Sequence, residues 1–335
     1  MKMDDMYYNR TISDPFSKLI EDGGSLRWLF DFVKEREDLD FLIGKTKSNE
    51  WISVYRGLTR IIRIQPHKGG VNYICLDAAD KYKHMASDLG LDIYGAKPPT
   101  FQFQEDLERL IEKTAADAKL DKYYVNRKEG YYQNVLSRKY GICGKSDYEF
   151  VIIDKESVIG YANQDQKDSL FGASQKKYKE LQRAISLLDP KRYGTALEKK
   201  AIGNELDFVA LDKEGNVLLI EYKHGANTSG IYLSPLQIGM YYDLFNSLQR
   251  EVLECAVYEM LDQKQKIGLI NTDWIKPAKI KAVIPVLIIS EFNYKGKGKL
   301  MFDEILGFTR TRKGEDFLNN LKTYNFTLEG GLTEW

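Results

Sequence analysis

The stretch that decides the fold is residues 205–223, which read ELDFVALDKEGNVLLIEYK. Two apolar runs, at residues 206–211 and 217–222, are separated by the turn sequence DKEGN. Glycine inside such a connection is typical of a hairpin, because glycine adopts positive φ at little cost. The second run is almost continuously apolar, which predicts a strand buried on both faces at the centre of a sheet.

Charged side chains stand at the end of this second predicted strand. Glu221 and Lys223 are two residues apart, so they point to the same side of the sheet. Asp207 lies on the preceding strand, and Glu205 shares its face. Burying a carboxylate without a partner is costly, and a divalent cation is the simplest compensating charge. Two carboxylates, a main-chain carbonyl and waters suit Mg²⁺ or Mn²⁺.

The pattern Asp-x(13)-Glu-x-Lys after a hairpin resembles the PD-(D/E)xK phosphodiesterase superfamily, which has the restriction-endonuclease-like fold. Leu206 stands where the name of the motif has proline. Downstream, Gln237 and Tyr241 resemble the Gln-x-x-x-Tyr element of the exonuclease and RecB-like branches. The family places the helix with this element beside the active site. We expect Ser234 and Pro235 to open that helix as N-cap and first residue.

The resemblance implies an α/β fold with a mixed sheet flanked by helices, and a nuclease that hydrolyses phosphodiester bonds in nucleic acid, expected to be DNA. Asp207 and Glu221 would bind Mg²⁺ or Mn²⁺ together with the main-chain carbonyl of Tyr222. Lys223 would position the attacking water and balance charge in the transition state. Gln237 is a further candidate catalytic residue.

An acidic residue on an upstream helix also belongs to the family pattern, and Glu129 is the candidate for it, with Glu180 as the alternative. Three other interpretations stay open. Glu221 and Lys223 could be a solvent-exposed cross-strand pair. The chain could be a catalytically silent nuclease-fold protein that binds nucleic acid or a protein partner. It could also be a scaffold in which residues 234–265 form a homodimer seam.

Composition and charge exclude several classes. The chain has 335 residues, of which 43% are hydrophobic and 29% charged, the balance of a globular protein. Its longest apolar run, residues 282–289, is far short of the roughly 20 residues of a membrane span. No secretory signal is expected, and the scattered Cys75, Cys143 and Cys255 indicate a reducing, cytoplasmic compartment. The 49 basic residues equal the 49 acidic ones, so only local patches can favour nucleic acid.

Two such basic patches occur, at residues 52–75 and 176–200. The first contains a predicted hairpin, residues 56–68, that could engage DNA or simply be a structural sheet with a cationic outer face. The second has eight lysines and arginines against three acidic residues, and a solvated face explains it equally well.

The organisation of the chain predicts two domains. Residues 1–100 would form an N-terminal α+β domain, with helix over most of residues 14–47 and antiparallel strands at 51–55, 59–65 and 71–76. A break at residues 95–100, with a proline pair, marks the boundary. Residues 101–335 would form the nuclease-like domain, with helices at 104–118, 129–138 and 176–188 and strands at 150–154 and 282–289.

Overall fold

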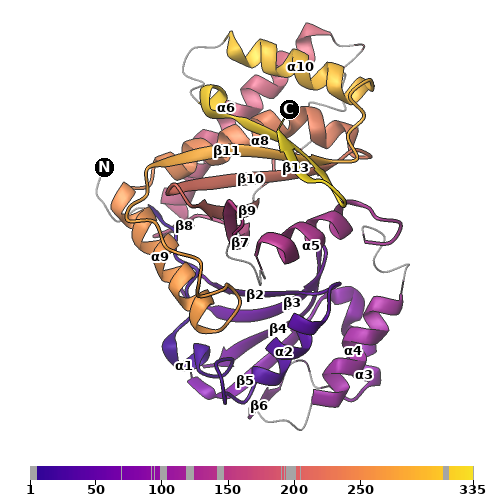
Figure 1. Cartoon of the computed structure of the whole chain (residues 1–335), viewed down its shortest axis with the longest axis vertical. Helices are drawn as coiled ribbons and strands as arrows, with labels where there is room; N and C mark the ends of the chain where they lie inside the picture. The colour runs from indigo at the N-terminus through magenta and orange to yellow at the C-terminus, as the bar shows by residue number, and fades with distance from the viewer. Residues whose placement is uncertain are drawn as a thin grey trace. The chain divides into compact units, whose positions relative to one another are not determined.

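A computed structural model of the chain shows two compact units (Figure 1). The N-terminal unit comprises Asn9–Val151 and Tyr258–Ile275, and the C-terminal unit comprises Met1–Tyr8, Ile152–Val257 and Lys276–Trp335. The structure describes residues 6–68, 70–91, 93, 95–98, 104–117, 124–141, 147–189, 191, 193, 201–203, 205–311 and 317–334. Cys143 and part of the basic segment 176–200 lie outside the described residues.

The N-terminal unit extends well beyond the boundary that we expected near residue 100. Helix α4 (Gln104–Ala116) follows that boundary, yet its Leu107, Leu110 and Ile111 are buried in the same hydrophobic core as the preceding strands. Ile267 and Leu269, from much later in the chain, complete this core. Apolar packing therefore sets the extent of the unit. The proline pair near residue 100 does not indicate this packing.

The N-terminal unit is built on a five-stranded antiparallel sheet in the order β2-β3-β4-β5-β6. Its first two helices precede the sheet, and α2 and the later α5 pack against β2. The elements in chain order are α1 (Asp14–Ser17), α2 (Arg27–Glu35), β2 (Asp40–Lys45), β3 (Glu50–Arg56), β4 (Thr59–His67), β5 (Gly70–Ala78), a 3-10 turn (Asp80–Tyr82), α3 (Lys83–Asp88), β6 (Ala96–Lys97), α4 and α5 (Glu129–Tyr140).

Strands β3, β4 and β5 confirm the three strands expected from alternation, whereas strand β2 corrects the expectation of helix over most of residues 14–47. The helical apolar stripe ends at Val33, at the end of α2. Beyond it, Phe41 and Ile43 alternate into the core while β2 pairs with β3. Strand pairing satisfies the backbone groups of this segment in a way that a continued helix would not.

The C-terminal unit contains a six-stranded mixed sheet in the order β13-β12-β11-β10-β9-β7. Strand β11 runs parallel to β10 and β12, whereas the β9–β10 and β12–β13 pairs are antiparallel. Helix α8 packs on β10 and β11, and α6 and α10 pack on α8 (Figure 1). The α/β class, with a mixed sheet and helices packed against it, is thus confirmed.

The elements of this part of the chain include a short separate sheet that pairs β1 with β8. In chain order they are β1 (Met6–Tyr7), β7 (Phe150–Ser157), β8 (Gly160–Tyr161), α6 (Gln164–Leu188), β9 (Leu206–Asp212), β10 (Asn216–His224), α8 (Thr228–Asn246), α9 (Arg250–Lys266), β11 (Ala282–Ser290), α10 (Lys297–Arg310), α11 (Phe317–Asn320), β12 (Lys322–Thr327) and β13 (Gly331–Glu334). Strand β7 and helix α9 contribute residues to both units.

The β9–β10 hairpin forms as expected. Gly215 in its turn has φ of +93°, the left-handed conformation that glycine adopts most readily. Every residue of β10 is buried, and β10 pairs with β9 on one side and with β11 on the other. The continuous apolar run therefore did identify a central strand.

Helix α8 begins earlier than expected. Asn227 is its N-cap and accepts a hydrogen bond from the Gly230 N–H at 3.0 Å, so Ser234 and Pro235 lie inside the helix and do not open it. Proline has no N–H to donate to the Ile231 carbonyl one turn earlier. The Ser234 hydroxyl donates to that carbonyl instead, at 2.6 Å, and allows the helix to continue through the proline.

Candidate functional site

Three charged side chains meet at the end of β10. The Glu221 side chain has no exposed surface, and the Lys223 ammonium group donates a hydrogen bond to Glu221 Oε1. The same ammonium group lies 3.9 Å from Asp207 Oδ2 on β9. Only 10% of the Lys223 side chain and 21% of the Asp207 side chain are exposed. These residues are therefore not a solvated cross-strand pair.

The backbone of β10 fixes the Asp207 carboxylate. Asp207 Oδ2 accepts a hydrogen bond from the Tyr222 N–H at 2.8 Å. The Tyr222 side chain lies on the opposite face of the strand, where its hydroxyl hydrogen-bonds to Ser290 Oγ at the end of β11. Tyr222 thus joins β9 to β10 through its main chain and β10 to β11 through its side chain, which gives the site a rigid base.

Helix α8 supplies the uncharged part of the site. The Tyr241 hydroxyl is buried, and burial raises its pKa; the nearby carboxylates of Glu221 and Asp207 raise it further. Tyr241 is therefore a protonated hydroxyl held near two carboxylates. Gln237 lies one turn earlier on the same face of α8 and is partly exposed.

A short segment before β9 lies against this helix. A Cβ atom added to Gly203 would lie 2.6 Å from Gln237 Nε2 and 3.6 Å from Tyr241 Oη. A side chain at this position would therefore displace the Gln237 amide, which is the far end of a flexible side chain. Gly203 could not be predicted as part of the site, since nothing near it in the sequence indicates a contact with a helix that starts 25 residues later.

The two candidates for an upstream acidic residue lie on helices of different units. Glu129 is the first residue of α5 and belongs to the N-terminal unit, and Glu180 is an exposed residue of α6. Glu205 is also exposed, although its charge contributes to the raised pKa of Tyr241. The ion pairs of the cluster join Lys223 to Glu221 and to Asp207.

The donor set of the cluster fits a Mg²⁺ ion more closely than a structural metal. Two carboxylates face one ammonium group, which leaves a net negative charge for a further cation. Mg²⁺ is commonly bound by one or two carboxylates, with waters and substrate phosphates as its other ligands. Within the described ranges, no three His, Cys, Asp or Glu side chains come together to hold a metal.

The basic hairpin of the N-terminal unit uses its arginines internally. The Arg56 guanidinium lies 4.1 Å from the Tyr124 ring centroid, and Arg60 forms an ion pair with Asp77 at 2.7 Å. Arg63 stacks on the buried Trp51 ring at 4.7 Å, and burial lowers its pKa. These contacts favour the structural interpretation of the three arginines. Lys68, in the turn between β4 and β5, is exposed.

Comparison of the chain with models of known protein families, with curated proteins and with solved structures finds no match. Among the described residues, no helix is both long enough and apolar enough to cross a bilayer. The function therefore has to be inferred from the side chains that meet at the end of β10.

Proposed function

We propose that the C-terminal unit is a Mg²⁺- or Mn²⁺-dependent nuclease that hydrolyses phosphodiester bonds, with DNA as the expected substrate. The observation that carries the proposal is the meeting of two carboxylates and a lysine at the buried end of a central strand. Such a cluster costs desolvation energy that apolar residues would not cost, so stability alone does not account for it. Functional sites are where such arrangements concentrate.

Each residue has a role that its position supports. Asp207 and Glu221 would hold the metal ion, which would neutralise phosphate charge and lower the pKa of a bound water. Hydrolysis adds water to phosphorus and breaks the bond to the leaving oxygen, and negative charge builds up on the phosphoryl oxygens. The Lys223 ammonium group lies beside both carboxylates, where it can orient the water and offset that charge.

The uncharged residues support the same chemistry. Tyr241 keeps its proton and can donate a hydrogen bond near the carboxylates, and the Gln237 amide can position a phosphate or a water. The resemblance to the PD-(D/E)xK superfamily agrees with this arrangement, since the helix with Gln237 and Tyr241 packs against β10, the strand that ends in Glu221 and Lys223.

The test compares the wild type with Asp207→Asn, Glu221→Gln and Lys223→Met on plasmid, linear duplex and single-stranded DNA and on RNA, with Mg²⁺ or Mn²⁺. We expect each substitution to slow cleavage by on the order of 10³ or more. Lys213→Met and Glu214→Gln are matched controls, because they make the same chemical changes at exposed positions in the turn of the same hairpin. Both controls should cleave like the wild type.

Equal cleavage by all the proteins would mean contamination and would overturn the proposal. A folded wild type that cleaves none of the substrates with either metal would overturn it as well. Binding of nucleic acid without cleavage would instead support the catalytically silent alternative.

A further inference from the structure

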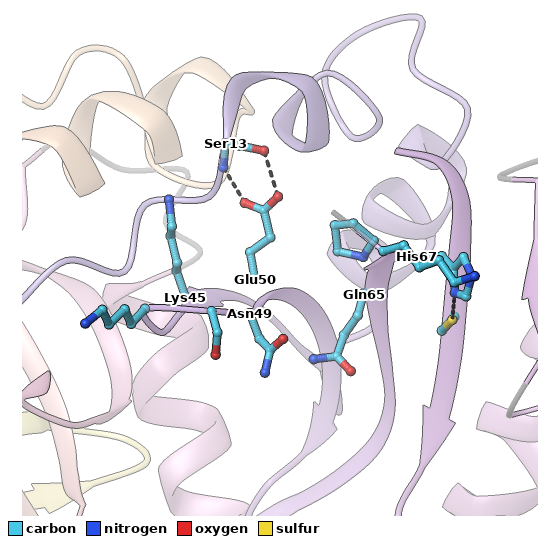
Figure 2. Close-up of a pocket in the computed structure, with 11 residues that line it drawn as sticks. Ser13, Lys45, Asn49, Glu50, Gln65 and His67 are labelled. Atoms are coloured by element: carbon cyan, nitrogen blue, oxygen red, sulfur yellow. Dashed lines mark hydrogen bonds between the residues drawn. The ribbon is translucent and has the colours of Figure 1, made fainter. Parts of the chain in front are cut away.

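A polar pocket lies at one end of the sheet in the N-terminal unit (Figure 2). In a run of antiparallel hairpins, the β2–β3 turn and the β4–β5 turn fall at the same end of the sheet. Residues of both turns line a cavity of about 470 Å³, which is within the usual size range of small-molecule sites. The cavity belongs to this unit alone and shares no residue with the cluster on β10.

The lining of the pocket carries an excess of positive charge. Lys45, Lys47 and Lys68 contribute three ammonium groups, and Glu50 is the only carboxylate among the described lining residues. Glu50 is already engaged, since its oxygens accept hydrogen bonds from the Ser13 N–H at 2.5 Å and the Ser13 hydroxyl at 2.7 Å (Figure 2). Within the part of the chain that the structure describes, neither Lys45 nor Lys68 forms an ion pair.

The walls of the pocket are held in place by local structure. The β2–β3 turn is closed by a hydrogen bond from the Thr46 N–H to the Asn49 carbonyl at 2.7 Å. On the β4–β5 side, the strand register shifts between Pro66 and His67, an irregularity of the kind that redirects side chains beside functional sites. His67 Nδ1 lies 3.3 Å from Cys75 Sγ, so the imidazole is fixed against the next strand (Figure 2).

We propose that this pocket binds phosphate groups, carried either by a free nucleotide or by the backbone of a nucleic acid strand. Ammonium groups bind phosphate as point charges, whereas a site for a planar carboxylate is usually built on arginine, which is absent from the described lining. The amides of Asn49 and Gln65 and the His67 ring add further hydrogen-bonding groups. The inference goes beyond the proposed nuclease activity and does not depend on it.

Cys75 provides a reporter inside the pocket. It is partly buried in the lining, whereas Cys255 on α9 is an exposed cysteine outside the pocket that serves as an internal control. The experiment measures alkylation of each thiol by iodoacetamide, using peptide mass spectrometry, in EDTA so that cleavage of DNA does not occur. The probes are ATP, inorganic phosphate and a short single-stranded DNA oligonucleotide.

A bound phosphate compound should slow the alkylation of Cys75 severalfold, in a saturable way, and leave Cys255 unchanged. In the Lys45→Gln/Lys68→Gln variant, the concentration that gives half-protection should rise about tenfold or more. Lys18→Gln/Lys113→Gln is the matched control, because it removes two exposed lysines of the same unit that do not line the pocket. Its half-protection should equal that of the wild type.

The same proteins are measured by equilibrium dialysis with radiolabelled ATP and with radiolabelled oligonucleotide. Tighter binding of ATP assigns the pocket to a free nucleotide, and tighter binding of the oligonucleotide assigns it to the nucleic acid backbone. The proposal is overturned if neither probe binds the folded wild type at millimolar concentration, or if the lysine variant binds as well as the wild type. The single variant Lys68→Gln, in an exposed turn, replaces the double variant if the latter does not fold.

Discussion

Lys223 is the residue on which the charge balance of the cluster depends. It is the ammonium group within 4.0 Å of both the fully buried Glu221 carboxylate and Asp207. Removing one partner of a buried ion pair leaves the other charge desolvated, which costs more than the pair itself contributes. The stability of the C-terminal unit should therefore respond unequally to substitutions of the two partners.

We expect Lys223→Met to lower the free energy of unfolding by about 3–5 kcal/mol in EDTA. Glu221→Gln should cost less, because the Lys223 ammonium group still lies 3.9 Å from Asp207. The double variant Glu221→Gln/Lys223→Met should be more stable than Lys223→Met alone, since it no longer leaves the fully buried Glu221 carboxylate without the Lys223 ammonium group. Urea unfolding followed by circular dichroism measures all four proteins.

A Lys223→Met variant as stable as the wild type would contradict this account. Lys213→Met is the control, because it removes an exposed lysine from the same hairpin. It should change the free energy of unfolding by less than about 0.5 kcal/mol.

The sequence was sufficient to predict Asp207, Glu221 and Lys223 as neighbours, because one hairpin carries all three and its register follows from a local turn. The spacing of four residues was likewise sufficient to place Gln237 and Tyr241 on one face of a helix. Nothing local identifies Gly203, and nothing local selects Glu129 over Glu180. Contacts between segments that are distant in sequence depend on tertiary packing, which cannot be predicted from the local pattern of a single sequence.

At the scale of elements, the chain just before β9 presses against α8 at Gly203. A methyl group there would lie 2.6 Å from Gln237 Nε2, and the flexible glutamine can move away at little energetic cost. Gly203→Ala should therefore leave the free energy of unfolding within about 0.5 kcal/mol of the wild type. It should lower the rate of DNA cleavage about tenfold or more by displacing the amide. Urea unfolding and a plasmid cleavage assay measure the two quantities.

Gly172→Ala, in helix α6, is the matched control. A Cβ atom at Gly172 would meet no atom within 4 Å, and alanine favours helix over glycine by about 0.5–1 kcal/mol. This variant should be slightly more stable than the wild type and should cleave DNA equally fast. A Gly203→Ala protein with unchanged activity would show that Gln237 has no part in cleavage.

Elements were predictable where the pattern is local and regular. The alternation in β3, β4 and β5 and the apolar run of β10 predicted strands that the structure contains. Strand β2 was missed because its apolar residues follow a helical stripe closely. The start of α8 was misplaced because Ser-Pro is typical of a helix start, whereas here the serine hydroxyl compensates for the missing proline N–H inside the helix.

At the scale of the whole molecule, the two units do not correspond to two halves of the sequence. A fragment of residues 1–100 lacks the core residues Leu107, Leu110 and Ile111 of α4 and also Ile267 and Leu269. We expect this fragment to show no cooperative thermal transition by circular dichroism, because its core is left open on these sides. A sharp transition would restore the boundary near residue 100 as a folding boundary. The full chain is the control.

The pocket in the N-terminal unit could not be predicted for a related reason. Its lysines lie in two different turns, and only the order of strands in the sheet brings these turns to the same end. In the sequence, Lys68 lies in a basic segment whose other positive charges include Arg56, Arg60 and Arg63. These three arginines contact other residues of the same unit.

The chain passes between the units near residues 8, 151, 257 and 275, twice within a regular element. A ribosome delivers residues in order, at roughly 5–20 per second. The N-terminal unit cannot close its core until Ile267 and Leu269 have emerged, and the mixed sheet of the C-terminal unit must wait for β11 to β13. Apolar surface of both units therefore stays uncovered for on the order of tens of seconds during synthesis, when a chaperone that holds nascent chains would benefit this protein most.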